Sequence, residues 1–185
     1  MPSSRAVIET TAAQVAHDHG IDEFPFDPSL AAEKAGISIE SRSELHGASG
    51  AIFLTDDPVI IHPSDMRGGL LNYTIGHELG HYFLSGHPEQ ILSEGGMHFS
   101  RGAPFSHKKP AIEAEADYFS ACFLMPRKQT RKLLTSSVSG LQGVINLHDE
   151  AVASMTSAAI RAAYCDPYPI AMAMVGADGM VRYSF

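Results

Sequence analysis

The segment that most constrains the fold of this chain is residues 69–85, a predicted amphipathic helix. Its apolar side chains recur at helical spacing, so one side of the helix has to be buried. These apolar residues are Leu71, Ile75, Leu79, Tyr82 and Phe83. Interleaved with them are His77, Glu78 and His81, and Gly86 is suited to end the helix. Because buried polar groups are costly without partners, the fold must give these three side chains something to bind.

The spacing of the two histidines predicts a zinc site. His77 and His81 are four residues apart, so on a helix their imidazoles stand on one face and can reach a single ion. Zinc takes such nitrogen ligands at about 2.0–2.1 Å, and a catalytic zinc site keeps one position for water. Glu78 lies about 100° round the helix from His77, where its carboxylate reaches that water without ligating the metal. We therefore expect Glu78 to act as general base in the hydrolysis of a peptide bond.

A third protein ligand is predicted on a second helix, residues 111–124. Glu113 and Asp117 are four residues apart and share a face, whereas Glu115 is about 200° round from Glu113 and faces nearly the opposite way. We expect Glu113 to bind the metal and Asp117 to hold the distal N–H of a zinc-bound imidazole. The alternative is that these carboxylates, like the histidines and Glu78 of the first helix, form a solvated or salt-bridged helix face.

Further polar side chains are candidates for stabilising the charge of a tetrahedral intermediate. They are Tyr82, His87, His98, His107 and His148. Each has an ordinary alternative, as a surface histidine or, for the tyrosine, as a packing residue. Cys122 falls within the second helix and is expected to be a small core residue.

Composition and charge describe one folded domain over residues 1–185. The chain is 44% hydrophobic and 18% charged, as in soluble globular proteins, and its net charge of −8 argues against nucleic-acid binding as its main activity. No apolar run approaches the roughly 20 residues that span a bilayer, and the N-terminus lacks the zones of a signal peptide. Two cysteines, Cys122 and Cys165, give no disulfide framework. We therefore expect a cytoplasmic protein.

The remaining pattern predicts an α+β fold, with a short antiparallel sheet packed on the 69–85 helix and further helices around it. Helices are also expected at residues 5–19, between Asp27 and Gly36, at 127–135 and at 149–164. Strands are expected at 37–40 and, as a hairpin, at 51–55 and 59–62. The stretch 87–110 is predicted to be irregular, and a hairpin is expected at about 169–185. The abrupt stop after Phe185 leaves room for a longer natural C-terminus.

Two sequence blocks together resemble the ImmA/IrrE family of zinc metallopeptidases. The first runs from Tyr73-Thr74 through the HELGH motif at His77–His81. The second runs from Glu113 to Pro126, with a Glu-rich start followed by Ala-Asp, Phe and a Leu-Met-Pro stop. The resemblance covers roughly residues 25–165, and the paired blocks are far more specific than an HExxH motif alone.

The resemblance implies a gluzincin-like fold, similar to a reduced thermolysin-type domain, with zinc held by the two motif histidines and Glu113 and with Glu78 catalytic. It also implies a protein substrate, because many members cut or otherwise inactivate a helix-turn-helix repressor that silences a mobile-element or stress-response operon. The sequence departs from the family pattern at Gly76, where Ala is usual, and at Asn72, where a basic residue is common. The stretch after the motif is also long and rich in histidine.

Three functions are compatible with these features. The first is a narrow-specificity zinc endopeptidase that acts on a repressor-like protein, without direct nucleic-acid binding and without a membrane. The second is a zinc-stabilised, non-catalytic module that sequesters a transcriptional regulator or antitoxin-like partner. The third is a metallohydrolase of a small amide. Structural zinc sites usually have four protein ligands and only three are evident here, so the pattern favours catalysis.

Overall fold

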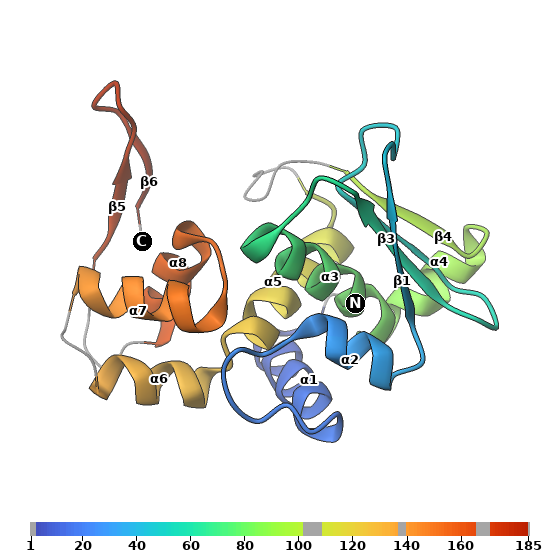
Figure 1. Ribbon diagram of the computed structural model, residues 1–185, viewed down its shortest axis with the longest axis horizontal. Coiled ribbons are helices and arrows are strands. Elements are labelled where there is room, and N and C mark those ends of the chain that lie inside the picture. Colours follow the sequence, from blue (N-terminus) through green and yellow to red (C-terminus); the bar gives the residue numbers. More distant parts are fainter. Residues whose placement is uncertain (1–2, 102–108, 137–139, 166–170, 185) are drawn as a thin grey trace.

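The computed structural model describes residues 3–101, 109–136, 140–165 and 171–184. It shows a mixed α+β fold, which confirms the predicted class (Figure 1). Its helices are α1 (Arg5–Asp18), α2 (Pro28–Lys34), α3 (Gly68–Phe83), α4 (His87–Ser93), α5 (Ala111–Leu124), α6 (Arg127–Ser136), α7 (Leu141–Ala151) and α8 (Met155–Cys165). Its strands are β1 (Ser38–Arg42), β2 (Gly50–Phe53), β3 (Val59–Pro63), β4 (Met97–Ser100), β5 (Ala173–Val175) and β6 (Val181–Ser184).

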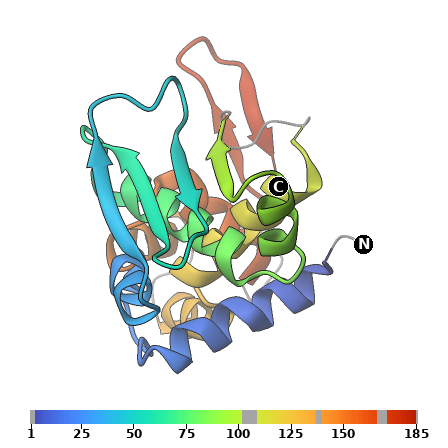
Figure 2. The ribbon, with the colours of Figure 1, turned by 90° about the vertical axis from the view of Figure 1, so that its right-hand side faces the viewer.

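Helices α3 and α5 lie at the centre of the molecule, between the four-stranded sheet on one side and α6 to α8 on the other (Figure 1). Helix α1 runs along the base and packs on α5 (Figure 2). Side-chain hydrogen bonds cap the first two helices, which the sequence predicted at residues 5–19 and between Asp27 and Gly36. The backbone N–H of Val7 donates to Oγ of Ser4 at 3.4 Å, and that of Ser29 donates to Oδ1 of Asp27 at 2.8 Å.

The sheet that covers α3 is mixed, with the strand order β1-β3-β2-β4. Strands β2 and β3 form the predicted antiparallel hairpin, in which Ala51 lies opposite Ile61. Strand β1 instead runs parallel to β3, with Ile39 opposite Ile60. The sequence predicted a short antiparallel sheet, and the observed sheet is antiparallel except for this one parallel pair. The reason is the strand order: β3 lies between β1 and β2, so β1 and β2 do not form a hairpin and β1 pairs with the opposite edge of β3.

The stretch after α3, predicted to be irregular, contains α4 and β4. Gly86 adopts a positive φ of 89° ahead of α4, and its N–H donates to the carboxylate of Glu89 at 3.0 Å. Strand β4 pairs antiparallel with β2, which lies far away in the sequence. Its strand character therefore depends on a non-local partner, which local patterning does not reveal. Residues 102–108, also within the stretch predicted to be irregular, lie outside the described residues.

The single helix predicted at 149–164 is wrong, because the structure has two helices, α7 and α8, over residues 141–165. Val152 separates them with a left-handed φ of 45°, and the N–H of Ala153 donates to the carbonyl of His148 at 3.2 Å. Neither glycine nor proline marks this break, so the sequence gives no ordinary stop signal there.

Two glycines allow α3 and α5 to pack closely. A Cβ atom at Gly80 would lie 3.0 Å from Cα of Ala116, and one at Gly76 would lie 2.7 Å from Oγ of Ser120. The Ser120 hydroxyl is held in place because it donates to the carbonyl of Tyr73 at 2.8 Å. This contact explains why glycine stands at position 76, where the family that the sequence resembles usually has alanine.

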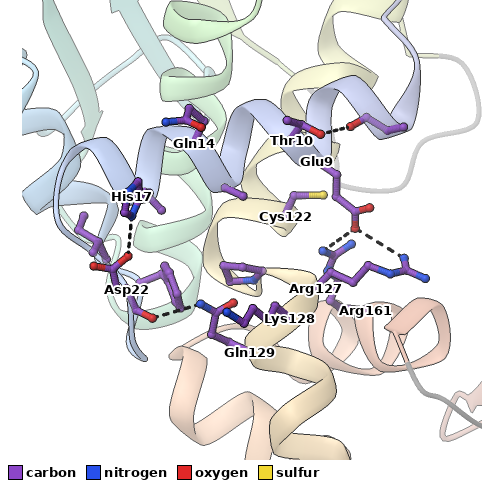
Figure 3. Close-up of a pocket in the computed structure, with 16 residues that line it drawn as sticks. Glu9, Thr10, Gln14, His17, Asp22, Cys122, Arg127, Lys128, Gln129 and Arg161 are labelled. Carbon is purple, nitrogen blue, oxygen red and sulfur yellow. Dashed lines mark hydrogen bonds and ion pairs between the residues drawn. The ribbon is translucent and has the colours of Figure 1, made fainter.

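A cavity of about 600 Å³ lies beneath α1 and is bounded by α1, α5, α6 and α8 (Figure 3). At its edge Oε1 of Glu9 lies 2.8 Å from Nη2 of Arg161 and 3.8 Å from Nη1 of Arg127. The Nε of Arg161 donates to the carbonyl of Met125 at 2.8 Å. We refer to Glu9, Arg127 and Arg161 as the ion-pair cluster.

The chain ends in the predicted hairpin, in which β5 and β6 pair antiparallel with Ala173 opposite Ser184. Residues 166–170 and 185 lie outside the described part. Among the helices of the described residues, none has both the length and the apolar character needed to cross a bilayer.

Candidate metal centre

Helices α3 and α5 bring the three predicted metal ligands together. The two Nε2 atoms of His77 and His81 lie 3.1 Å apart. Nε2 of His81 lies 3.2 Å from Oε1 of Glu113, and Nε2 of His77 lies 3.5 Å from Oε2 of the same carboxylate. All three side chains are buried, and their candidate ligand atoms fall within 4.8 Å of one another.

This spacing fits a tetrahedral zinc ion. Bonds of about 2.0–2.1 Å in tetrahedral geometry place neighbouring ligand atoms roughly 3.3–3.4 Å apart. The two ring nitrogens are 3.1 Å apart, and they lie 3.2 and 3.5 Å from the two different oxygens of the Glu113 carboxylate. Two imidazoles and one carboxylate are also a ligand set that zinc accepts with a fourth position open for water. The residues present therefore suit the metal.

The protein's own groups divide protons unevenly in this cluster. Burial alone would lower the pKa of His77, but hydrogen bonds with Asp117 and Glu113 outweigh it and raise that pKa to about 9. Burial lowers the pKa of His81 to about 3. Burial would raise the pKa of Glu113, yet hydrogen bonds with His77, His81 and His98 hold it well below its usual range. The pair of facing ring nitrogens thus shares one proton, in a position that a metal ion can take.

The carboxylate of Glu78 is fully buried beside the cluster. Its Oε1 accepts a hydrogen bond from the hydroxyl of Ser100 at 2.7 Å, whereas its Oε2 has no hydrogen-bond partner among the described residues. Glycine at position 50 makes this placement feasible, because a Cβ there would lie 2.6 Å from Oε1. Burial raises the pKa of Glu78. One oxygen is therefore anchored, and the other is a buried acceptor without a partner among the described residues.

Asp117 lies behind His77, with its Oδ1 3.0 Å from Nδ1 of the imidazole. The same carboxylate accepts hydrogen bonds from Oη of Tyr73 at 2.5 Å and from Nζ of Lys109 at 2.6 Å. Burial would raise the pKa of Asp117, but the hydrogen bonds with His77, Lys109 and Tyr73 and the charge of His77 together outweigh it and keep that pKa low. A carboxylate in this position fixes the tautomer of the imidazole, so that Nε2 faces the metal site.

His98 approaches the cluster from the edge strand β4. Its Nε2 lies 2.7 Å from Oε1 of Glu113, and its side chain is 19% exposed. Sequence reasoning offered His98 only as one of five candidates, and missed Ser100 and Lys109 entirely. These residues reach the site through strand pairing and through the turn into α5, which no local spacing encodes.

Two of the other candidates make contacts elsewhere. Tyr82 packs edge-on against Phe83 with 5.0 Å between ring centroids, and Nδ1 of His148 contacts the carbonyl of Ala153. His107 lies outside the described residues.

His87 is buried, and not the ordinary surface histidine of the alternative interpretation. Its Nδ1 lies 3.2 Å from Nδ1 of His81, and its Nε2 lies 3.3 Å from Oε2 of Glu115. Glu115 indeed contributes no oxygen to the three-atom cluster, but it reaches the neighbourhood through His87. The available signal was Gly86-His87-Pro88, a turn-forming glycine followed by a helix start, which folds the chain back over the end of α3.

Sequence comparison now gives the family. The profile of the IrrE N-terminal-like domain, Peptidase_M78, matches residues 32–162. The chain belongs to this family. The matched residues include both the HELGH helix and the helix that carries Glu113, so the M78 match places the chain in a peptidase family whose members depend on a metal. The His77, His81 and Glu113 cluster is where this M78 domain can hold the ion.

Comparison with curated proteins gives no match. Among solved structures, a Mycobacterium tuberculosis transcriptional regulator is similar, with a TM-score of 0.67 and 14% sequence identity. The similarity covers 97% of this chain and 54% of the regulator, so this M78 domain spans about half of that protein. At this identity the likeness concerns the fold alone.

Proposed function

We propose that the chain is a zinc-dependent endopeptidase of narrow specificity. The observation that carries the proposal is the geometry of four buried side chains. Two imidazole nitrogens and the two oxygens of one carboxylate converge, with separations of 3.1–3.5 Å, and beside them Glu78 presents one anchored oxygen and one without a partner among the described residues. This is the arrangement that a general base requires next to a metal-held water.

In this proposal His77, His81 and Glu113 would hold zinc, which when bound would acidify a water molecule and polarise the scissile carbonyl. Glu78 takes a proton from the attacking water at Oε2 while Ser100 holds Oε1. The water oxygen forms a bond to the carbonyl carbon, and the carbon–nitrogen bond then breaks. Glu78 delivers the proton to the leaving amine, so the carboxylate returns to its starting form.

We assign stabilisation of the developing oxyanion to His98. Among the described candidates, it is the one whose ring nitrogen contacts a metal ligand while its side chain stays partly exposed. His87 is occupied by His81 and Glu115, and the other candidates make contacts elsewhere. A donor on an edge strand can reach the carbonyl oxygen of a bound substrate without leaving its hydrogen-bonded sheet.

The substrate that we propose is a cytoplasmic helix-turn-helix repressor-like protein. The resemblance of the paired sequence blocks to the ImmA/IrrE family supports this class of substrate. The net charge of −8 supports action on the regulator rather than on nucleic acid.

One observation favours the alternative, a zinc-stabilised module that sequesters a regulator without cutting it. The cavity bordered by Glu78, Tyr73 and Lys109 measures about 50 Å³. That is room for one or two water molecules and not for a peptide. Cleavage requires a peptide to reach this cavity, whereas sequestration does not.

Substitution of Glu78 separates the two functions. We expect Glu78→Gln to keep about one zinc per chain by elemental analysis and to lower cleavage by at least about 100-fold, since it removes the general base. Protein N-termini would be compared in cells that carry wild type or Glu78→Gln, a comparison that works on an unidentified substrate. An N-terminus that depends on Glu78 supports the endopeptidase. Its absence, with the biological effect retained by Glu78→Gln, supports the binding module.

A further inference from the structure

The two histidine ligands differ in what holds their second ring nitrogen. Nδ1 of His77 lies directly against the carboxylate of Asp117 at 3.0 Å. Nδ1 of His81 lies 3.2 Å from Nδ1 of His87, whose Nε2 lies 3.3 Å from Oε2 of Glu115. We propose that His87 and Glu115 form a positioning relay that orients His81 toward the metal. This inference rests on the proposed zinc site.

The proton positions in this relay are fixed from both ends. A neutral His81 that ligates through Nε2 must carry its proton on Nδ1. His87 must then accept at its own Nδ1 and carry its proton on Nε2. That N–H points at the carboxylate of Glu115, which can only accept. In the opposite tautomer of His87, its Nδ1–H would face the Nδ1–H of His81, and its unprotonated Nε2 would face the carboxylate of Glu115. One arrangement of protons therefore satisfies all three groups.

The backbone places the relay by folding α4 back over the end of α3. Helix α3 ends at Phe83, and the N–H of His87 donates to the carbonyl of Leu84 at 3.1 Å. Gly86 between them has a φ of 89°, a conformation that side-chain-bearing residues rarely adopt. His87 therefore becomes the first residue of α4, and its ring stacks at a tilt on that of His81 with 5.2 Å between centroids.

Glu115 completes the relay from α5. Its Oε2 faces His87, and its Oε1 accepts a hydrogen bond from the backbone N–H of Ser3 at 3.0 Å. The side chains of His87 and Glu115 are only 5% and 12% exposed. Water therefore competes little for these hydrogen bonds, and three separate segments cooperate to hold one imidazole.

Removal of the relay should weaken zinc binding, because a partner of this kind contributes about 10- to 100-fold to metal affinity. We expect His87→Ala to raise the zinc Kd by about 10- to 100-fold. His87→Phe fills the same space without a nitrogen acceptor, so it should lose as much affinity if orientation is the role and little if packing is. Glu115→Gln keeps an acceptor oxygen for His87 and should lose about tenfold or less.

The zinc Kd of the full chain would be measured by competition with a chromophoric chelator. Exposed His17, on α1 and paired with Asp22, provides the matched control His17→Ala, which should stay within about twofold of wild type. Circular dichroism of each variant would confirm that it folds.

The outcomes separate this inference from the proposed function. A zinc Kd for His87→Phe within twofold of wild type would overturn the relay and leave the zinc peptidase standing. Weakened binding in that variant, together with no Glu78-dependent cleavage, would keep the relay and remove the peptidase. Wild type that binds no zinc would overturn both.

Discussion

Two polar regions flank α5, and their charged groups are arranged in opposite ways. In the ion-pair cluster the carboxylate of Glu9 faces two guanidinium groups, and Arg161 also donates to a backbone carbonyl (Figure 3). In the metal centre, two ring nitrogens and a carboxylate point their lone pairs at one another. The first region pairs its carboxylate with the protein's own cations, whereas the second brings together lone pairs that need a proton or a cation between them. Convergence of like lone pairs, and not burial of charge in itself, therefore identifies the metal site.

The largest expected effect is on the zinc Kd, which should depend on the carboxylate of Glu113 and not on that of Glu9. The binding free energy of a structural zinc site is about 10–16 kcal/mol, which corresponds to roughly 3–4 kcal/mol for each of its four ligands. We therefore expect Glu113→Ala to raise the zinc Kd by roughly 200- to 1,000-fold. Glu9→Ala serves as the control and should leave the Kd within about twofold. Chelator competition measures both, and equal losses would show that overall stability, not ligation, controls zinc binding.

The free energy of unfolding should depend on the ion-pair cluster. Glu9→Ala removes the charge that pairs with Arg161, whose side chain is 2% exposed. Leaving a buried cation without its partner costs about 3 kcal/mol of unfolding free energy. Denaturant unfolding would measure it, with Arg161→Met beside it as a variant that removes the cation and keeps much of the volume. We expect the methionine variant to be the more stable of the two, and the reverse order would contradict the ion-pair interpretation.

The position of Glu78 can be tested without touching a ligand. A methyl group at position 50 would lie 2.6 Å from its Oε1 and 2.8 Å from Cγ2 of Thr74. Gly50→Ala must displace the carboxylate, and a shift of about 1 Å in a reacting group lowers the rate by about 100-fold. We expect Glu78-dependent cleavage to fall by that amount while zinc content stays at about one per chain. A variant that loses zinc in parallel with cleavage would instead indicate a general collapse of the site.

The smallest expected effect is the change in zinc affinity for each unit of pH. His77, with its pKa near 9, carries a proton at neutral pH that the metal must displace. The apparent affinity for zinc should therefore fall about tenfold for each pH unit below 9. Without zinc, the stabilising hydrogen bonds of protonated His77 are complete below pH 6.5 and are lost as the pH rises through about 9. Asp117→Asn removes one of those partners and should make zinc binding less dependent on pH, as titrations between pH 6.5 and 8.5 would show.

Helical spacing explains why so much of the site could be predicted. His77, His81, Glu113 and Asp117 lie on two helices, and an interval of four residues determines which side chains share a face. The residues that complete the site come from elsewhere. Ser100 and His98 belong to a strand that exists only because β2 offers its edge.

The fold shows the same division. The hairpin of β2 and β3 follows from local turn residues, and α2 follows from its cap. The parallel pairing of β1 depends on a choice between distant edges of the sheet. The break at Val152 depends on a left-handed backbone conformation, which is rare for a β-branched residue and has no local sequence signal.

Gly80 determines how closely α3 and α5 approach each other at the candidate metal centre. Its missing side chain lets the backbone of α3 come so near to α5 that an added Cβ would lie 3.0 Å from Cα of Ala116 and 3.2 Å from Cβ of Phe119. The distance between the helices helps to determine the distance between the motif histidines on α3 and Glu113 on α5. Metal sites tolerate errors of only about 0.2 Å in bond length. Gly80, the fourth residue of HELGH, thus helps to set the distance between the candidate ligands, so that a substitution there can change the candidate metal site while every ligand residue stays the same.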